Sequence, residues 1–226
     1  MFHLINNSLM SKILLGHYQG IERVCMKEQL LQLVALSLAS VTVMILHELP
    51  KAILYHYMNK NSYRRSNMFK IVHYIDPIGL ILCITTLTGF SKPYMYRIKK
   101  RKTNLLLGIT GFITLFTIFL LSITIWKNCY PMGETYTYST IIEWTLKNFP
   151  NYFLQFMAAI SINMFFVNLI PISTFDIGLI IAGKSPGKYF SLIRNDYFIK
   201  VILILTVVFR VIPSITTLLI RFLITF

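Results

Sequence analysis

One stretch of the sequence constrains the fold more than any other, because residues 104–126 form a run of 23 amino acids with no charged side chain. A helix of about 20 apolar residues is long enough to cross the hydrocarbon core of a bilayer. The whole chain has a similar character, since 55% of its residues are hydrophobic, 13% are charged and the mean hydropathy is +0.63. Soluble domains carry about a quarter charged residues. The composition therefore argues against a soluble enzyme and predicts an all-α, polytopic integral membrane protein.

Four apolar segments are long enough to be full spans, namely residues 30–58, 104–126, 152–172 and 199–226. Residues 75–90 are also apolar, but they number only 16 and include Asp76 and Pro77. We therefore predict a short re-entrant segment there rather than a full span. Residues 1–29 mix charged and apolar side chains, which indicates an N-terminal amphipathic or peripheral segment. The remainder, residues 30–226, is predicted to be a single transmembrane domain.

The basic residues predict how the chain is oriented in the membrane. The formal net charge is +14, and the cations lie between the apolar runs. The predicted loops at 59–70, 92–102 and 184–200 carry four, six and four basic residues, whereas 127–139 carries one. Basic loops remain on the cytoplasmic side, so the first three are predicted to be cytosolic. This distribution favours contact with an anionic lipid bilayer over nucleic acid, and a bacterial cytoplasmic membrane is the predicted location.

Acidic residues are scarce, and their positions point to a functional site. The chain has eight of them, and Glu48, Asp76 and Asp176 lie in or at the edge of apolar segments. Ionisable groups at that depth are energetically expensive and are usually functional or paired. His47 and Lys51 are four residues apart, so they share one face of a helix. The same spacing in an HExxH helix holds two zinc-binding histidines and a general-base glutamate. Taken alone, this motif is more typical of a histidine–glutamate pair that only bonds its neighbours.

Several motifs occur together in an order that makes the pattern more specific. They are His47-Glu48-x-x-Lys51, His73-Tyr-Ile-Asp76-Pro77-Ile-Gly79, Gly89-Phe-Ser-Lys92-Pro93, and Asn168-x-x-Pro171 followed by Asp176-Ile-Gly178. In this order and at these separations, they resemble the motifs of the site-2 protease family of intramembrane zinc metalloproteases. The resemblance covers about residues 30–183.

The resemblance implies a function and a set of site residues. It implies zinc-dependent cleavage of membrane-embedded peptide segments, with His47 and Asp176 as zinc ligands and Glu48 as the general base that activates water. Asn168, Pro171 and Asp76 would support this site. The third zinc ligand is not identified, because Lys51 replaces the second histidine and a lysine ammonium has no lone pair. The family's Gly-Pro-x-x-Asn motif also departs here, since only Gly111 of its three defining residues is retained.

These departures leave three functions open. The chain is a zinc endopeptidase with an unrecognised third ligand, or a catalytically inactive pseudoprotease that binds membrane proteins, or a small transporter component. For the pseudoprotease we predict that Lys51 puts a fixed positive charge where zinc would sit. That charge would pair with Asp176 and Glu48, because pairing offsets much of the cost of isolated charges in the membrane.

Overall fold

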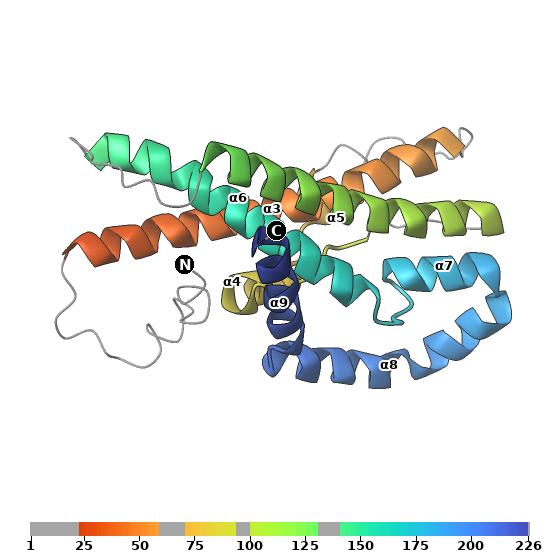
Figure 1. The fold of residues 1–226 in the computed structure, drawn as a ribbon. Coiled ribbons are helices and arrows are strands. Elements are labelled where there is room, and N and C mark those ends of the chain that lie inside the picture. The colour runs from red at the N-terminus through yellow and green to blue at the C-terminus, as the bar shows by residue number, and fades with distance from the viewer. Residues whose placement is uncertain (1–22, 59–70, 94–99, 131–140, 226) are drawn as a thin grey trace.

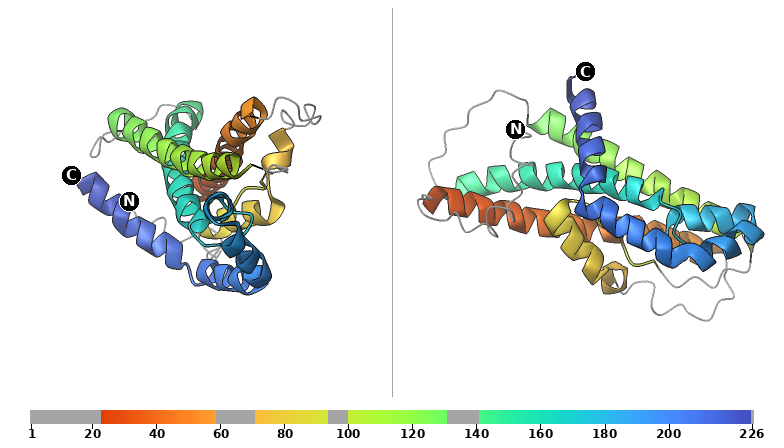
Figure 2. Two further views of the ribbon diagram at one scale, coloured as in Figure 1. Left: turned by 90° about the vertical axis from the view of Figure 1, so that its right-hand side faces the viewer. Right: turned by 90° about the horizontal axis from the view of Figure 1, so that it is seen from below.

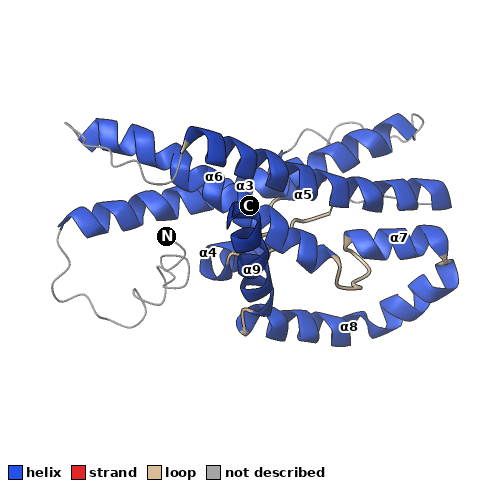
Figure 3. Ribbon diagram, in the orientation of Figure 1, coloured by secondary structure: helices blue, strands red, loops and turns tan. Residues whose placement is uncertain are grey.

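The computed structural model describes residues 23–58, 71–93, 100–130 and 141–225, and all the regular elements in these ranges are helical (Figure 3). The three longest helices are α3 (Arg23–Met58), α5 (Arg101–Cys129) and α6 (Ile141–Asn168), and they pack against one another (Figures 1 and 2). The shorter helix α7 (Asp176–Lys184) lies against α5. Long apolar sequences favour this all-helical solution, because a helix satisfies its backbone hydrogen bonds within one segment.

The core lies between α3, α5 and α6, with the short helix α4 (Pro77–Thr86) packed against α3. It is built from apolar side chains that are 0% exposed, including Val43, Met44, Leu115, Ile160 and Met164. The burial of these side chains fixes how the three helices pack against one another. It thereby also fixes the position of the polar residues of α3 inside the bundle.

Two helices are long and apolar enough to cross a membrane, α3 over Glu28–Met58 and α5. A third candidate is α8 (Pro186–Val208) followed by α9 (Val211–Thr225), a pair bent by 59°. The predicted membrane protein of helical class is therefore supported, but four full spans are not confirmed. Helix α6 has the length of a span, yet it carries amide side chains such as Gln155 and the buried Asn163. Such residues lower the hydropathy of a helix that packs its polar groups inward.

The helix boundaries differ from the sequence prediction at three places. Helix α3 already begins at Arg23, so residues 23–29 continue into the first apolar helix rather than forming a separate segment, and residues 1–22 lie outside the described part. The basic stretch 184–200 was predicted as a loop, but it forms the end of α7 and about the first two thirds of α8. The last predicted span is divided at Arg210, a non-glycine residue with a φ of 53°.

Residues 71–93 turn back on themselves. A 3-10 helix, η1 (Ile71–Tyr74), precedes α4, and Asp76 caps α4 by accepting hydrogen bonds from the backbone N–H groups of Ile78 and Gly79, both at 2.9 Å. After α4 the chain returns until the N–H of Lys92 donates to the carbonyl of Tyr74 at 3.0 Å. At 1.5 Å per residue, the ten residues of α4 span about 15 Å, half a bilayer core.

Candidate functional site

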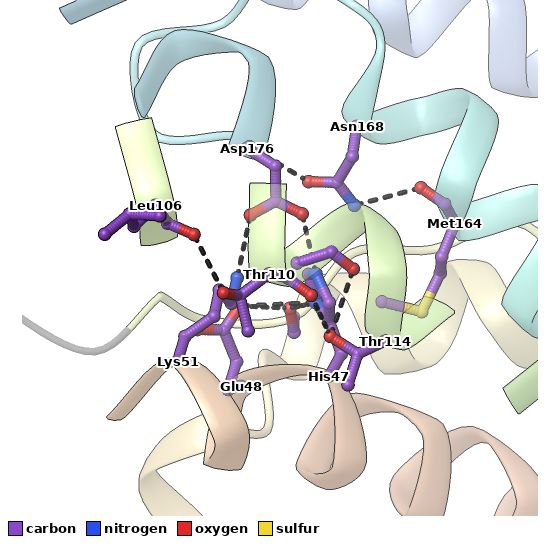
Figure 4. Close-up of polar contacts among 11 residues, drawn as sticks. His47, Glu48, Lys51, Leu106, Thr110, Thr114, Met164, Asn168 and Asp176 are labelled. Atoms are coloured by element: carbon purple, nitrogen blue, oxygen red, sulfur yellow. Dashed lines mark hydrogen bonds and ion pairs between the residues drawn. The ribbon is translucent and has the colours of Figure 1, made fainter. Parts of the chain in front are cut away.

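Helix α3 places three polar side chains in the interior of the bundle. His47, Glu48 and Lys51 follow one another within a little over one turn, and they are 1%, 1% and 2% exposed. Asp176, the first residue of α7, faces them and is 1% exposed. Figure 4 shows that the side chains of the two helices point toward one another. Residues 129 positions apart in the sequence therefore form one buried cluster, as the motif order predicted.

Lys51 bridges the two carboxylates of this cluster. Its Nζ donates to Glu48 Oε1 at 2.7 Å and to Asp176 Oδ1 at 2.9 Å. The contacts predicted for Lys51 are thus both present. Breaking up a buried, hydrogen-bonded ion pair leaves an uncompensated charge, so each of the three groups depends on the other two.

His47 uses both ring nitrogens. Nε2 lies 2.7 Å from Asp176 Oδ2, and Nδ1 lies 2.8 Å from Ser91 Oγ. Ser91 in turn donates to Glu48 Oε1 at 2.8 Å, and it is 6% exposed. Ser91, which lies in the segment that follows α4, therefore connects His47 to Glu48 and completes a ring of polar contacts with Lys51 and Asp176. Sequence reasoning missed this residue, although it lies inside the motif 89–93, because nothing in its spacing shows that this segment returns to α3.

The hydrogen atoms in the cluster can be counted. The five hydrogen bonds of His47, Ser91, Glu48, Lys51 and Asp176 need five hydrogens. Lys51 supplies two, Ser91 supplies one and a neutral imidazole supplies one. Because Ser91 donates to Glu48, the imidazole N–H is used on Ser91, and the one further proton that is needed lies between His47 Nε2 and Asp176 Oδ2. With it the single lysine, the histidine and the two carboxyl groups sum to zero charge, which is the least costly state for a buried cluster.

The residues around Asp176 hold its backbone in place. The N–H of Asp176 donates to Asn168 Oδ1 at 3.4 Å, and Asn168 Nδ2 donates to the carbonyl of Met164 at 2.9 Å. Asn168 therefore supports Asp176, in agreement with its predicted role. Pro171 lies exposed in the connection between α6 and α7, and Asp76 caps α4. None of the hydrogen bonds or ion pairs within the described ranges joins Pro171 or Asp76 to the cluster.

A glycine on α5 makes room for the Asp176 side chain. A Cβ atom at Gly111 would overlap the Asp176 carboxylate, and one at Gly108 would lie 2.5 Å from the Asp176 carbonyl oxygen. Helix α7 can approach α5 this closely because these positions lack side chains. Gly111 was noted in the sequence only as the remnant of a family motif, and the structure gives it a packing role.

Replacing Gly111 tests this close approach. In an unconstrained helix Gly→Ala is stabilising by roughly 1 kcal/mol, but here the methyl group would displace a carboxylate held by His47 and Lys51. We expect Gly111→Ala to destabilise the protein by about 1–3 kcal/mol, measured by unfolding in detergent. Gly187→Ala on α8 is the control, because nothing lies within 4 Å of its Cβ position. Equal stabilisation by both changes would refute the close packing.

The side chains of this cluster are poorly suited to the zinc ion that the resemblance implies. The Lys51 ammonium donates to both carboxylates and has no lone pair for a metal. His47 Nε2 and Asp176 Oδ2 are 2.7 Å apart, whereas two ligands of tetrahedral zinc, each at about 2.0–2.1 Å, lie roughly 3.3 Å apart. Over the described ranges, no group of three or more His, Cys, Asp or Glu residues is arranged to hold a metal. The donor set therefore does not fit catalytic zinc.

One oxygen of the cluster has no hydrogen-bond partner among the described residues. Glu48 Oε2 is buried and accepts no hydrogen bond from the described part of the protein.

Comparisons with known proteins do not identify a family for this chain, because no family model, no curated protein and no solved structure matches it. Any functional assignment therefore depends on the residues of the site.

Proposed function

We propose that this protein is a site-2-protease-like membrane protein that binds membrane-embedded segments of other proteins without cleaving them. The observation that carries the proposal is the position of Lys51. It stands where the family has its second zinc-binding histidine, and its ammonium bridges Glu48 and Asp176 at 2.7 and 2.9 Å. A fixed positive charge would thereby replace the metal and hold the two helices together.

A second feature supports the loss of catalysis. Where the family motif on the middle span has asparagine, this chain has Leu115, which is 0% exposed and belongs to the apolar core. A leucine has no group that donates to a peptide carbonyl. With neither the second histidine nor this amide, the cluster would keep the arrangement of a protease centre but lack one of its zinc ligands and one of its hydrogen-bond donors.

The proposed membrane arrangement follows the resemblance. In it α3, α5, α6 and the α8–α9 pair are the four spans, and α4 enters and leaves on one side. The hairpin of residues 71–93, closed by the contact between Lys92 and Tyr74 at 3.0 Å, supports a re-entrant α4. The basic ends of α5 and α8 would then face the cytosol.

Co-expression with model single-span membrane proteins tests the proposed function. We expect photo-crosslinkers on α3 and α5 to capture the span of a co-expressed protein. We also expect the same fragment pattern from the wild type, from Glu48→Gln and from samples treated with a zinc chelator. New fragments that disappear in Glu48→Gln and on chelation would contradict the proposal and establish a zinc endopeptidase. The absence of any crosslinked span would contradict the binding function.

A further inference from the structure

Six exposed cations gather at one end of the bundle, and we call this set the basic end surface. Its members are Lys100, Arg101, Lys102, Lys184, Lys188 and Arg194. The end of α7 lies against the first turn of α5, since a Cβ at Gly183 would be 2.7 Å from the Arg101 carbonyl oxygen. Figure 1 shows the start of α5, the end of α7 and the start of α8 at this end. Three helices thus bring their basic termini together.

The acidic residues of these helices do not balance the basic end surface. Helix α5 contains none, and Asp176 of α7 is buried in the cluster described above. Asp196 of α8 is 9% exposed, and it is engaged by Lys200 at 2.7 Å and by the N–H of Ser173 at 2.9 Å. Within these three helices the positive charge of the surface is therefore not neutralised, and it can attract an anionic partner.

Aromatic side chains adjoin these cations on the outward face of α8. Phe190, Arg194, Tyr197 and Phe198 are spaced by four, three and one residues, so they share one helix face. The three aromatic residues are 71%, 83% and 68% exposed. The amphipathic ring of tyrosine favours the boundary between headgroups and acyl chains, phenylalanine on a helix at that boundary inserts toward the acyl chains, and nearby cations attract anionic headgroups. We propose that the basic end surface, with this aromatic face, binds anionic phospholipid headgroups.

The surface is held in a fixed position relative to the rest of the protein. Asp196 joins α8 to the backbone of Ser173, and the Tyr189 hydroxyl donates to the Ser173 carbonyl at 3.5 Å. Ser173 lies three residues before Asp176. Helix α8 is thus tied to the connection that leads into α7, so the helices that carry the cations are already in place and need not be ordered by a lipid.

Titration of lipids into the detergent-solubilised protein, followed by native mass spectrometry, tests this proposal. We expect tighter binding of phosphatidylglycerol than of phosphatidylcholine. Each cation near an anionic surface contributes about a factor of five, so Lys184→Gln/Lys188→Gln should weaken phosphatidylglycerol binding about 10- to 30-fold. The control, Lys127→Gln/Lys147→Gln, removes two exposed cations from the opposite end of the bundle and should leave the affinity within about twofold.

Three results would overturn the proposal: equal binding of the two lipids by the wild type, equal losses in the two double variants, or no loss in the first. Should Lys184→Gln/Lys188→Gln fail to fold, Lys102→Gln/Arg194→Gln removes the same charge from α5 and α8 and carries the same expectation. The thermal midpoint in detergent identifies a variant that is misfolded. Because no residue of the buried cluster is changed, this test is independent of whether the protein cleaves its partners.

Discussion

Lys51→Met should destabilise the protein by about 3–5 kcal/mol, because it leaves the buried carboxylates of Glu48 and Asp176 without the cation that bridges them. Methionine has a similar length and is apolar, so the change removes the charge with little change in volume. Unfolding in mixed detergent micelles measures the loss. Among the changes considered, this one has the largest expected effect on stability.

A lysine with the same contact in a more exposed setting provides the control. Lys200 contacts Asp196 at 2.7 Å, as Lys51 contacts Glu48, but its side chain is 50% exposed. An ion pair of that kind contributes about 1 kcal/mol or less, so Lys200→Met should have a small effect. Lys51→Met/Glu48→Gln/Asp176→Asn, which removes the opposing charges as well, should recover much of the stability. Equal losses in Lys51→Met and Lys200→Met would show that Lys51 does not neutralise a buried cluster.

Lys51→His should create a zinc site, because it puts a second imidazole beside His47 and Asp176 in place of the ammonium. The new imidazole would lie on the same face of α3 as His47, four residues away, and opposite Asp176. Two histidines and one carboxylate satisfy the three-ligand requirement of catalytic zinc and leave a position for water. We expect the zinc content of the purified variant to rise to about one ion per chain. Addition of zinc should then raise its thermal midpoint, because a ligand that binds only the folded state stabilises it.

The ligand set of this variant can be checked by removing its other members. Lys51→His/His47→Ala and Lys51→His/Asp176→Asn should each lose the bound zinc while Lys51→His/Lys200→Gln retains it. A folded Lys51→His variant that takes up no zinc would mean that His47, residue 51 and Asp176 do not converge as the structure describes. Zinc retained in both double variants would place the ion elsewhere in the protein.

The buried cluster shows what local sequence spacing can and cannot supply. Helical periodicity alone puts His47 and Lys51 on one face, and the charge pairing of Lys51 followed from the cost of isolated ions in a membrane. The meeting with Asp176 required the motif order, because no local rule joins two helices so far apart. Ser91 and Gly111 were not anticipated as parts of the site. Their roles depend on where a returning segment and a neighbouring helix pass, which is a property of the tertiary packing.

The fold, like the buried cluster, could be predicted from the sequence only in part. The uncharged run of 104–126 predicted α5 well, since nothing in it favours another structure. The stretch 184–200 was mistaken for a loop because its four basic residues suggested a solvated connection. Long basic side chains can extend from a helix toward water or headgroups, so basic residues alone do not end a helix. In the same way, the amides of α6 lower its hydropathy without preventing a 28-residue helix.

Metal analysis of the wild-type protein tests the central claim most directly. The protein should be purified without chelators from cells grown with added zinc, and its zinc content measured by mass spectrometry alongside that of Lys51→His. If the Lys51 ammonium takes the place of the metal, the wild type will contain far less than one zinc per chain while the variant contains about one. One tightly bound zinc per wild-type chain, lost in His47→Ala, would contradict the account and restore the zinc endopeptidase.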